Sequence, residues 1–213
     1  MEKPIIATTL SELFIKSNAW DNAHLLWFEK AAEMLKDDSI KKWINKPDYF
    51  KGVEEVMQRL YPNLSDEQRT VKARETYFDS VLKSIGENSE YVNKEIVGYF
   101  TSLKDKYRLA LITTNTRPAL KKILELTNLV DLFDLIETSD PKEKDNKKVV
   151  FERFIEENGK PLIYIGGRRK ESYDYCKDNG IPCIFVNLEG DEDIEGLRCV
   201  HNLNEIKQVI EEL

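Results

Sequence analysis

The chain has 213 residues, of which 41% are hydrophobic and 33% are charged, and its formal net charge is -7. A chain of this length forms one large domain, or one domain with a smaller one inserted, and its apolar fraction can fill a core. The acidic balance argues against nucleic acid as a partner, because phosphate backbones need a basic face. It does not argue against a small anion held in a local basic pocket.

Cysteine and histidine are few and scattered. They are Cys176, Cys183, Cys199, His24 and His201. Because no Cys-x-x-Cys pair is present, a structural zinc site is poorly supported. An odd, sparse set of cysteines is typical of a reducing compartment, and we expect a cytoplasmic protein. No apolar run approaches the roughly 18 residues needed to span a membrane, so we expect no membrane partner.

The first third of the chain predicts one strand followed only by helices. A β-branched run at residues 4–10 predicts the strand. Apolar residues at three-four spacing predict a long amphipathic helix up to residue 35, and shorter helices are expected over 39–45 and 50–60. Ser65 and Gln68 have the spacing of a capping box, which predicts the start of another helix that ends at 86–88. Aromatic residues at helical spacing in this block are interpreted as packing residues: Trp20, Trp27, Tyr77 and Phe78.

From residue 91 onward, predicted helices and strands alternate. The predicted strands cover residues 109–112, 132–137, 162–165, 181–186 and 199–200. The predicted helices cover residues 93–106, 119–126, 149–157 and 203–213, with another that ends at 179–180. Such alternation implies a parallel sheet with right-handed crossovers. The sequence therefore predicts an α/β core of residues 1–15 and 86–213, with an all-helical cap of residues 16–85.

One strand of this core ends in residues suited to bind a ligand. The apolar run 109–112 is followed by Thr113, Thr114 and Asn115, and Pro118 then opens the next helix. Side chains at the carboxyl end of a parallel strand lie where open α/β sheets bind their ligands. Thr114 and Asn115 are therefore candidate ligand contacts. The alternative interpretation is a buried strand with a polar turn.

The whole layout resembles the haloacid dehalogenase (HAD) superfamily, in its form with a helical cap after the first strand. The resemblance covers essentially the whole chain and rests on residues 5–14, 91–115, 132–140, 162–186 and 202–206. It implies a Rossmann-like parallel sheet and a phosphorylated small-molecule ligand. Members of the superfamily are mostly magnesium-dependent phosphatases that pass a phosphoryl group through an aspartyl-phosphate.

The resemblance places the superfamily's Asp-x-Asp motif at Thr8 and Leu10, with the register set by Leu13 and Phe14. In the superfamily the first Asp attacks phosphorus and the second transfers protons. Residues 3–11 contain no carboxylate in any register. A threonine hydroxyl is a poor nucleophile without an adjacent base, and a leucine cannot transfer a proton.

The second and third motifs of the superfamily have candidates in this chain. Thr114, followed by Asn115, fits the residue that holds the phosphoryl group. Lys144 is our choice for the lysine that neutralises it, counting back from Phe151, with Lys142 and Lys147 as substitutes. The alternative interpretation is that each is a solvated surface lysine, because a run of charged residues usually lies on a solvent-exposed surface.

The fourth motif, which ligates magnesium through acids, is also altered. Counting back from Gly180 places Arg168 in the first acid position and Ser172 in the second. A shift by one residue gives Gly167 and Glu171 instead. Because Mg²⁺ needs carboxylate oxygens, we expect no magnesium cofactor unless the site has been rebuilt.

The same stretch suggests a different chemistry. Arg168 and Arg169 can clamp a phosphate or a carboxylate without a metal, and Gly167 would let backbone N–H groups approach an anion. The alternative interpretation is that both arginines pair with carboxylates of the chain itself.

Three functions follow from these patterns. The first is a degenerate HAD-fold protein that acts as an anion-binding or regulatory module without phosphatase activity. The second is an active hydrolase that uses Thr8 or a displaced acid, with magnesium, the candidate acids being Glu12, Asp140, Glu171 and Asp174. The third is an assembly protein with an exposed apolar patch built from Trp20, Trp27 and Trp43.

Overall fold

The computed structural model describes residues 3–46, 48–190 and 192–213 of the chain. In this part of the chain, parallel strands form one sheet with the order β3-β2-β1-β4-β5-β6. The strands are β1 (Ile5–Thr8), β2 (Arg108–Thr116), β3 (Leu135–Ser139), β4 (Ile163–Gly166), β5 (Cys183–Val186) and β6 (Arg198–Val200). The predicted parallel α/β fold is confirmed.

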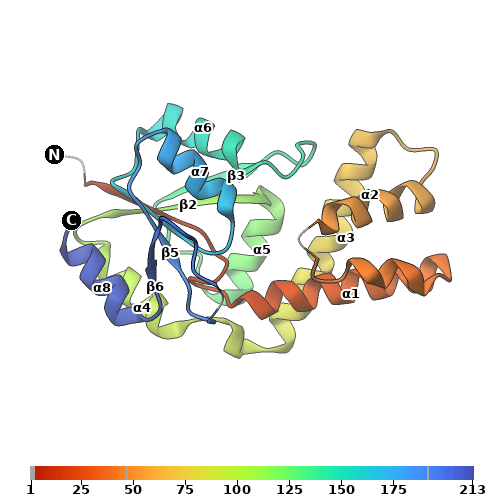
Figure 1. Ribbon diagram of the computed structural model, residues 1–213, viewed down its shortest axis with the longest axis horizontal. Coiled ribbons are helices and arrows are strands. Elements are labelled where there is room, and N and C mark those ends of the chain that lie inside the picture. Colours follow the sequence, from red (N-terminus) through yellow and green to blue (C-terminus); the bar gives the residue numbers. More distant parts are fainter. Residues whose placement is uncertain (1–2, 47, 191) are drawn as a thin grey trace.

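Helices cover both faces of the sheet (Figure 1). Residues of α4 (Lys94–Leu103), α5 (Arg117–Thr127) and α8 (Leu203–Glu211) share a hydrophobic cluster with Ile6 of β1. Residues of α6 (Lys147–Asn158) and α7 (Lys170–Asp178) share a second cluster with Ile5 and Ala7. Successive residues of a strand point to opposite faces, and Ile5, Ile6 and Ala7 are all apolar because both faces of β1 are buried.

The structure differs from the predicted strands most clearly at β3. The prediction began this strand at residue 132, but Leu132 and Phe133 lie in a turn before it, and both are buried. Asp134 then joins the turn to β2, because its N–H donates to Leu109 O at 2.8 Å and its carboxylate accepts from Leu109 N at 2.9 Å. An apolar pair buried in a turn has the same sequence pattern as the start of a buried strand.

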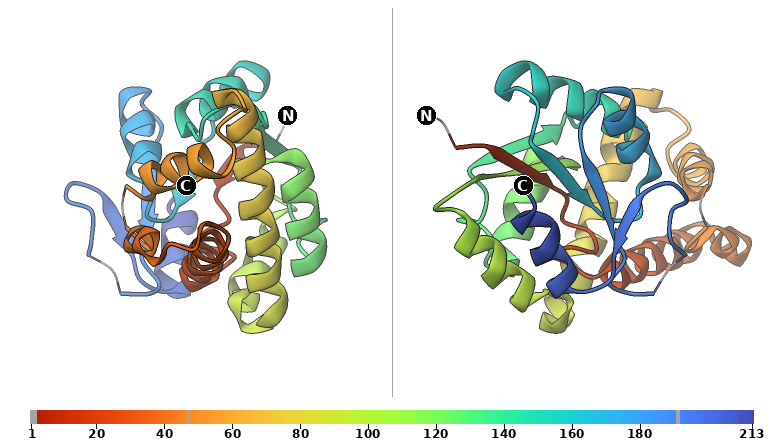
Figure 2. Two further views of the ribbon diagram at one scale, coloured as in Figure 1. Left: turned by 90° about the vertical axis from the view of Figure 1, so that its right-hand side faces the viewer. Right: turned by 60° about the vertical axis from the view of Figure 1, so that its left-hand side comes forward.

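A helical insertion lies between β1 and β2, beyond the carboxyl ends of the strands (Figures 1 and 2). It consists of α1 (Ser17–Leu35), the short 3-10 helix η1 (Asp38–Trp43), α2 (Tyr49–Leu60) and α3 (Asp66–Glu87), with the turn η2 (Ser89–Tyr91) after it. The predicted capping box of α3 is confirmed: Gln68 N donates to Ser65 Oγ at 3.2 Å, and Ser65 N donates to Gln68 Oε1 at 2.9 Å.

One end of the insertion packs against the sheet, and the other end has its own hydrophobic core. Ala19 and Ala23 of α1 and Val81 and Ile85 of α3 belong to the cluster that packs on the sheet. The far end is held by a third cluster that includes Phe28, Ile40 and Val56. The boundaries of a separate cap at residues 16–85 stay a prediction.

The tryptophans of the insertion pack inward. Trp27 is buried, and Trp20 and Trp43 are partly buried against the hydrophobic clusters. The exposed apolar patch that an assembly function requires is therefore not built from these side chains. No helix in the described part of the chain is long and apolar enough to cross a membrane.

Substitutions at two helical glycines test how Trp43 packs on α2. A Cβ at Gly52 of α2 would overlap the Trp43 side chain, whereas a Cβ at Gly98 of α4 would meet nothing within 4 Å. We expect Gly52→Ala to destabilise the protein by about 1–3 kcal/mol through overpacking. Gly98→Ala should stabilise it by about 0.5–1 kcal/mol, because alanine loses less backbone entropy in a helix. Urea unfolding of both variants is the measurement, and equal effects would contradict the packing of Trp43 on α2.

Candidate functional site

The end of β2 reaches past its neighbour and carries polar residues toward the insertion. β1 pairs with β2 only as far as Thr8 and Leu111, and β2 continues to Thr116. The extra residues include Thr114 and Asn115, the two candidate ligand contacts predicted from the sequence. Because β1 ends first, the end of β2 borders the space between the sheet and the insertion.

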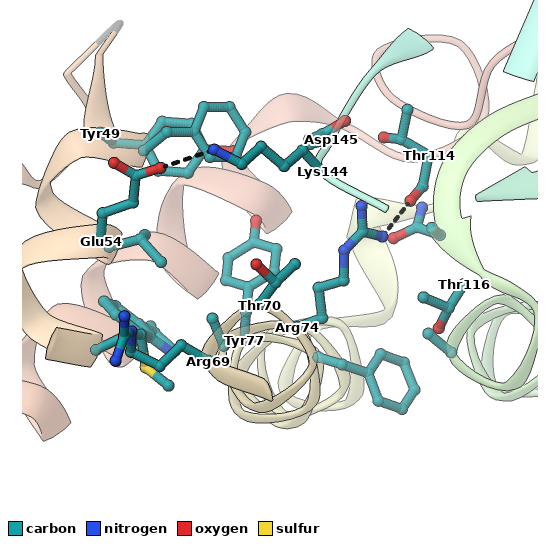
Figure 3. A pocket seen from close by; sticks show the side chains of 18 of the residues that line it. Tyr49, Glu54, Arg69, Thr70, Arg74, Tyr77, Thr114, Thr116, Lys144 and Asp145 are labelled. Carbon is teal, nitrogen blue, oxygen red and sulfur yellow. Dashed lines mark hydrogen bonds and ion pairs between the residues drawn. The ribbon is translucent and has the colours of Figure 1, made fainter. Parts of the chain in front are cut away.

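A pocket of about 440 Å³ occupies this space. Its insertion side is formed by α2 and α3 and is largely apolar, with Tyr49, Val53 and Tyr77 among the lining residues. Its sheet side is polar and includes Thr114 and Asp145 (Figure 3). Its volume falls in the range of small-molecule sites, and an apolar pocket with a few polar groups is the usual form of such sites.

Arg74 of α3 lies where the insertion meets the sheet. Its guanidinium donates to Thr114 O at 3.0 Å and to Ser139 Oγ at 3.3 Å. Burial lowers the pKa of Arg74, and the nearby carboxylates of Asp145 and Glu143 oppose that shift. The group stays charged because an arginine pKa starts above about 12.

The other cations that line the pocket have carboxylate partners. Arg69 pairs with Asp66, and Lys144 Nζ lies 3.7 Å from Glu54 Oε1. Among the described residues, Arg74 instead donates to one carbonyl and one hydroxyl, with no carboxylate in an ion pair to it. Sequence reasoning missed Arg74, because nothing in the local pattern of α3 distinguishes it from a surface arginine.

The three candidate lysines have different surroundings. Lys144 lines the pocket and is exposed, and Figure 3 shows it reaching across to Glu54 on α2. Lys142 is also exposed and pairs with Glu67 of α3 at 2.8 Å. Exposed ion pairs contribute little to stability, so these two contacts are easily opened. Lys147 is buried and donates to Ile112 O of β2.

The positions that the resemblance assigned to the first motif do not face the pocket. Thr8 is fully buried, and its hydroxyl donates to Ala110 O of the neighbouring strand at 2.9 Å. Leu10 is buried in the cluster that packs on the sheet. The hydroxyl of Thr8 is thus used within the sheet, and the role of nucleophile stays a prediction without geometric support.

Glu12 occupies the space above the ends of β1 and β4. Its side chain is only 3% exposed, and Oε1 lies 3.0 Å from Arg168 Nε and accepts from Ser17 Oγ at 3.3 Å. A Cβ at Gly167 would overlap the Glu12 carboxylate. A side chain at position 167 would therefore displace the Glu12 carboxylate. The approach of backbone N–H groups of Gly167 to a bound anion stays a prediction.

Arg168 has further carboxylates around it. Asp21 Oδ2 of α1 lies 3.8 Å from its guanidinium, and Glu189 Oε2 lies 3.7 Å from it. Glu189 also accepts from the N–H of Ser17, the first residue of α1, at 2.8 Å. Arg168 thus links the loop after β4 to the start of the insertion. An external anion at Arg168 would have to displace these partners.

Arg169 connects the sheet to the loop before α6. Its guanidinium donates to Thr114 Oγ1 at 3.0 Å and pairs with Asp145 at 2.7 Å and Glu171 at 3.0 Å. Asn115 turns back on its own strand, donating from Nδ2 to Thr113 Oγ1 at 3.0 Å. The structure therefore brings Thr114 and Arg169 together, with Asp145 paired to Arg169, and both Thr114 and Asp145 line the pocket.

Magnesium, which the superfamily implies, is not matched by the donors at the strand ends. Mg²⁺ binds through one or two carboxylates together with other hard oxygens. The acid positions hold Leu10, Arg168 and Ser172, and the nearby carboxylate of Glu12 already faces a guanidinium. In the described residues, no group of three or more His, Cys, Asp or Glu side chains has the arrangement of a metal site.

The pH dependence of the free energy of unfolding tests the burial of Lys147 beside this site. Burial, and then the charge of Arg169, lower the pKa of Lys147 from 10.5 to about 7. Between these values the unfolded chain holds a proton that the folded chain has released, so stability rises with pH. Relative to Lys147→Met, the wild-type free energy of unfolding should rise by about 2 kcal/mol from about pH 7 to about pH 9. Urea unfolding measures this difference, and a constant difference across that range would contradict the burial.

Several proteins of known structure have a similar fold. Solved structures of similar fold include a predicted phosphatase from Clostridium acetobutylicum, with 23% identity, full coverage of both chains and a TM-score of 0.70. A haloacid dehalogenase-like hydrolase family protein from Streptococcus pneumoniae has 17% identity, 98% coverage of both chains and a TM-score of 0.67. A putative beta-phosphoglucomutase from Thermotoga maritima has 18% identity, full coverage of both chains and a TM-score of 0.63. These likenesses show the fold.

No curated protein matches the chain in sequence. The sequence profile described as haloacid dehalogenase-like hydrolase matches residues 16–184, which is well over half of the chain. The chain therefore belongs to the haloacid dehalogenase-like hydrolase family.

Proposed function

We propose that this protein is a family member without phosphatase activity that binds a small anionic ligand, and that it acts as a binding or regulatory module. The observation that carries the loss of activity is the ion pair of Glu12 with Arg168. It fills the space above β1 and β4 with a carboxylate and a guanidinium, at 3.0 Å from one another. Phosphoryl transfer through an aspartyl-phosphate needs a free carboxylate nucleophile there, and Thr8 does not supply one.

The anion-binding part of the proposal rests on Arg74. It is a cation on the pocket wall whose hydrogen bonds, within the described residues, go to neutral oxygens. Arg74 is partly buried, and a partly buried guanidinium binds a carboxylate or phosphate more strongly than one in water, because charge-assisted hydrogen bonds are stronger at low dielectric. Arg168 and Arg169, the sequence candidates, already have carboxylate partners.

The rival function is an active hydrolase with a rebuilt site. Its candidate acids are held by other groups or lie away from the pocket. Glu12 pairs with Arg168, and Glu171 pairs with Arg169. Asp140 accepts from Lys142 N at 2.8 Å, and Asp174 is exposed on α7. The family match favours this alternative, and the ion pairs that hold Glu12 and Glu171 argue against it.

The first test is turnover. With p-nitrophenyl phosphate we expect no release of nitrophenol above the protein-free rate, with or without magnesium, from about pH 5 to about pH 9, the range in which general acids and bases operate. Thr8→Ala should give the same result as the wild type. Turnover that requires magnesium, is abolished by EDTA and is lost in Thr8→Ala would refute the inactive assignment.

The second test is anion binding through Arg74, measured by isothermal titration calorimetry with phenyl phosphate and glycerol 3-phosphate. At least one of these should bind, and Arg74→Gln should weaken that binding about tenfold or more, because it removes hydrogen bonds to a charged group. Lys72→Gln is the matched control, since Lys72 lies one half-turn away on α3, beside Glu75 at 3.8 Å. Binding of neither compound, or equal binding by all three proteins, would overturn the anion site.

A further inference from the structure

The pocket beside Arg74 has two chemically different ends. Toward the insertion, its lining includes the aromatic and aliphatic side chains of Tyr49, Val53 and Met57 from α2, together with polar side chains such as Gln58 and Thr70. Toward the sheet, Arg74 faces the end of β2 and the loop before α6 (Figure 3). A ligand that fills the pocket must therefore present an apolar part to one end and a charged part to the other.

The sheet end favours negative charge. Besides Arg74, the N-terminal end of α5 lies there, because Thr116 and Ala119 both line the pocket. A helix N-terminus carries partial positive charge. The carboxylate of Asp145 also lies at this end, but it is paired with Arg169 at 2.7 Å. Two independent positive features thus point to one anionic group.

The insertion end favours a flat ring. The rings of His24 and Tyr49 lie 4.2 Å apart, and those of His24 and Tyr77 lie 5.3 Å apart, so the three form a continuous aromatic wall. Two of these rings, Tyr49 and Tyr77, line the pocket. Aromatic rings pack well against one another in offset or edge arrangements. Burial raises the pKa of Tyr77, so its hydroxyl remains a neutral donor.

We propose that the pocket selects an aryl anion: a ligand with a flat aromatic body and one terminal carboxylate, sulfonate or phosphate group. This inference rests on the proposed function, since it names the ligand class of the same anion site. The aromatic body packs against Tyr49, Val53 and Tyr77, and the anionic group meets Arg74. An aromatic body gains more from burial against these rings than the body of a sugar phosphate, whose hydroxyls lose hydrogen bonds to water wherever they face the rings.

An exposed ion pair lies along the pocket. Lys144 of the loop before α6 pairs with Glu54 of α2, and both residues line the pocket. Such pairs are screened by salt and contribute little to stability.

Three probes separate the parts of this inference in calorimetric titrations: 1-naphthyl phosphate, glycerol 3-phosphate and neutral 1-naphthol. On the wild type, we expect naphthyl phosphate to bind at least about tenfold more tightly than glycerol 3-phosphate, because the naphthyl ring buries apolar surface. Arg74→Gln should weaken naphthyl phosphate about tenfold or more. Val53→Asn, which makes the apolar end polar without touching Arg74, should weaken it several-fold, with circular dichroism as the check on folding.

The outcomes distinguish this inference from the proposed function. If glycerol 3-phosphate binds as tightly as naphthyl phosphate and Arg74→Gln abolishes both, the aryl inference fails and the anion site stands. If naphthol binds the wild type as tightly as naphthyl phosphate, the anionic group contributes nothing and both fail. If neither phosphate binds, both fail as well. The wild-type titrations alone decide the last two cases, and the first case also needs Arg74→Gln.

Discussion

The arrangement of the site depends on one buried carboxylate. Glu12 is almost fully enclosed, and a buried charge is tolerated only where an opposite charge and hydrogen bonds compensate it. Arg168 provides that charge at 3.0 Å, and Gly167 provides the space, because any side chain there would overlap the carboxylate. The pair also holds the start of the insertion, through Ser17 and Asp21. Replacing Arg168 would remove the guanidinium that pairs with the buried Glu12, whereas Arg168 has two further carboxylates nearby, Asp21 and Glu189.

This constraint determines where a ligand can bind. With the ends of β1 and β4 filled, the open space lies to one side, between α2, α3 and the overhanging end of β2. Its walls come from distant parts of the chain: an apolar wall from the insertion, and a polar wall from β2 and the loop before α6. Under the proposed function, the family framework is retained, while a guanidinium and aromatic rings, rather than a metal and carboxylates, are available to a ligand.

The fold was largely predictable from the sequence, and the site was not. Two local patterns of the sequence are present in the structure: the capping box of Ser65 and Gln68, and the hydroxyl residues that end β2. The pairing of Glu12 with Arg168 joins residues far apart in the sequence, which only the tertiary structure brings together. Arg74 is indistinguishable from a surface residue until α3 packs beside β2. Conversely, Arg168 and Arg169 looked like free cations because their carboxylate partners lie on other elements.

The central claim is that an internal ion pair replaces the metal and carboxylate chemistry of the family above β1 and β4. Manganese binding followed by electron paramagnetic resonance tests it most directly, because Mn²⁺ prefers the oxygen ligands that bind Mg²⁺. The account predicts no stoichiometric Mn²⁺ site in the wild type, with Glu12 engaged by Arg168. One tightly bound Mn²⁺ that is lost in Glu12→Gln would show that this carboxylate serves a metal instead, and would contradict the account.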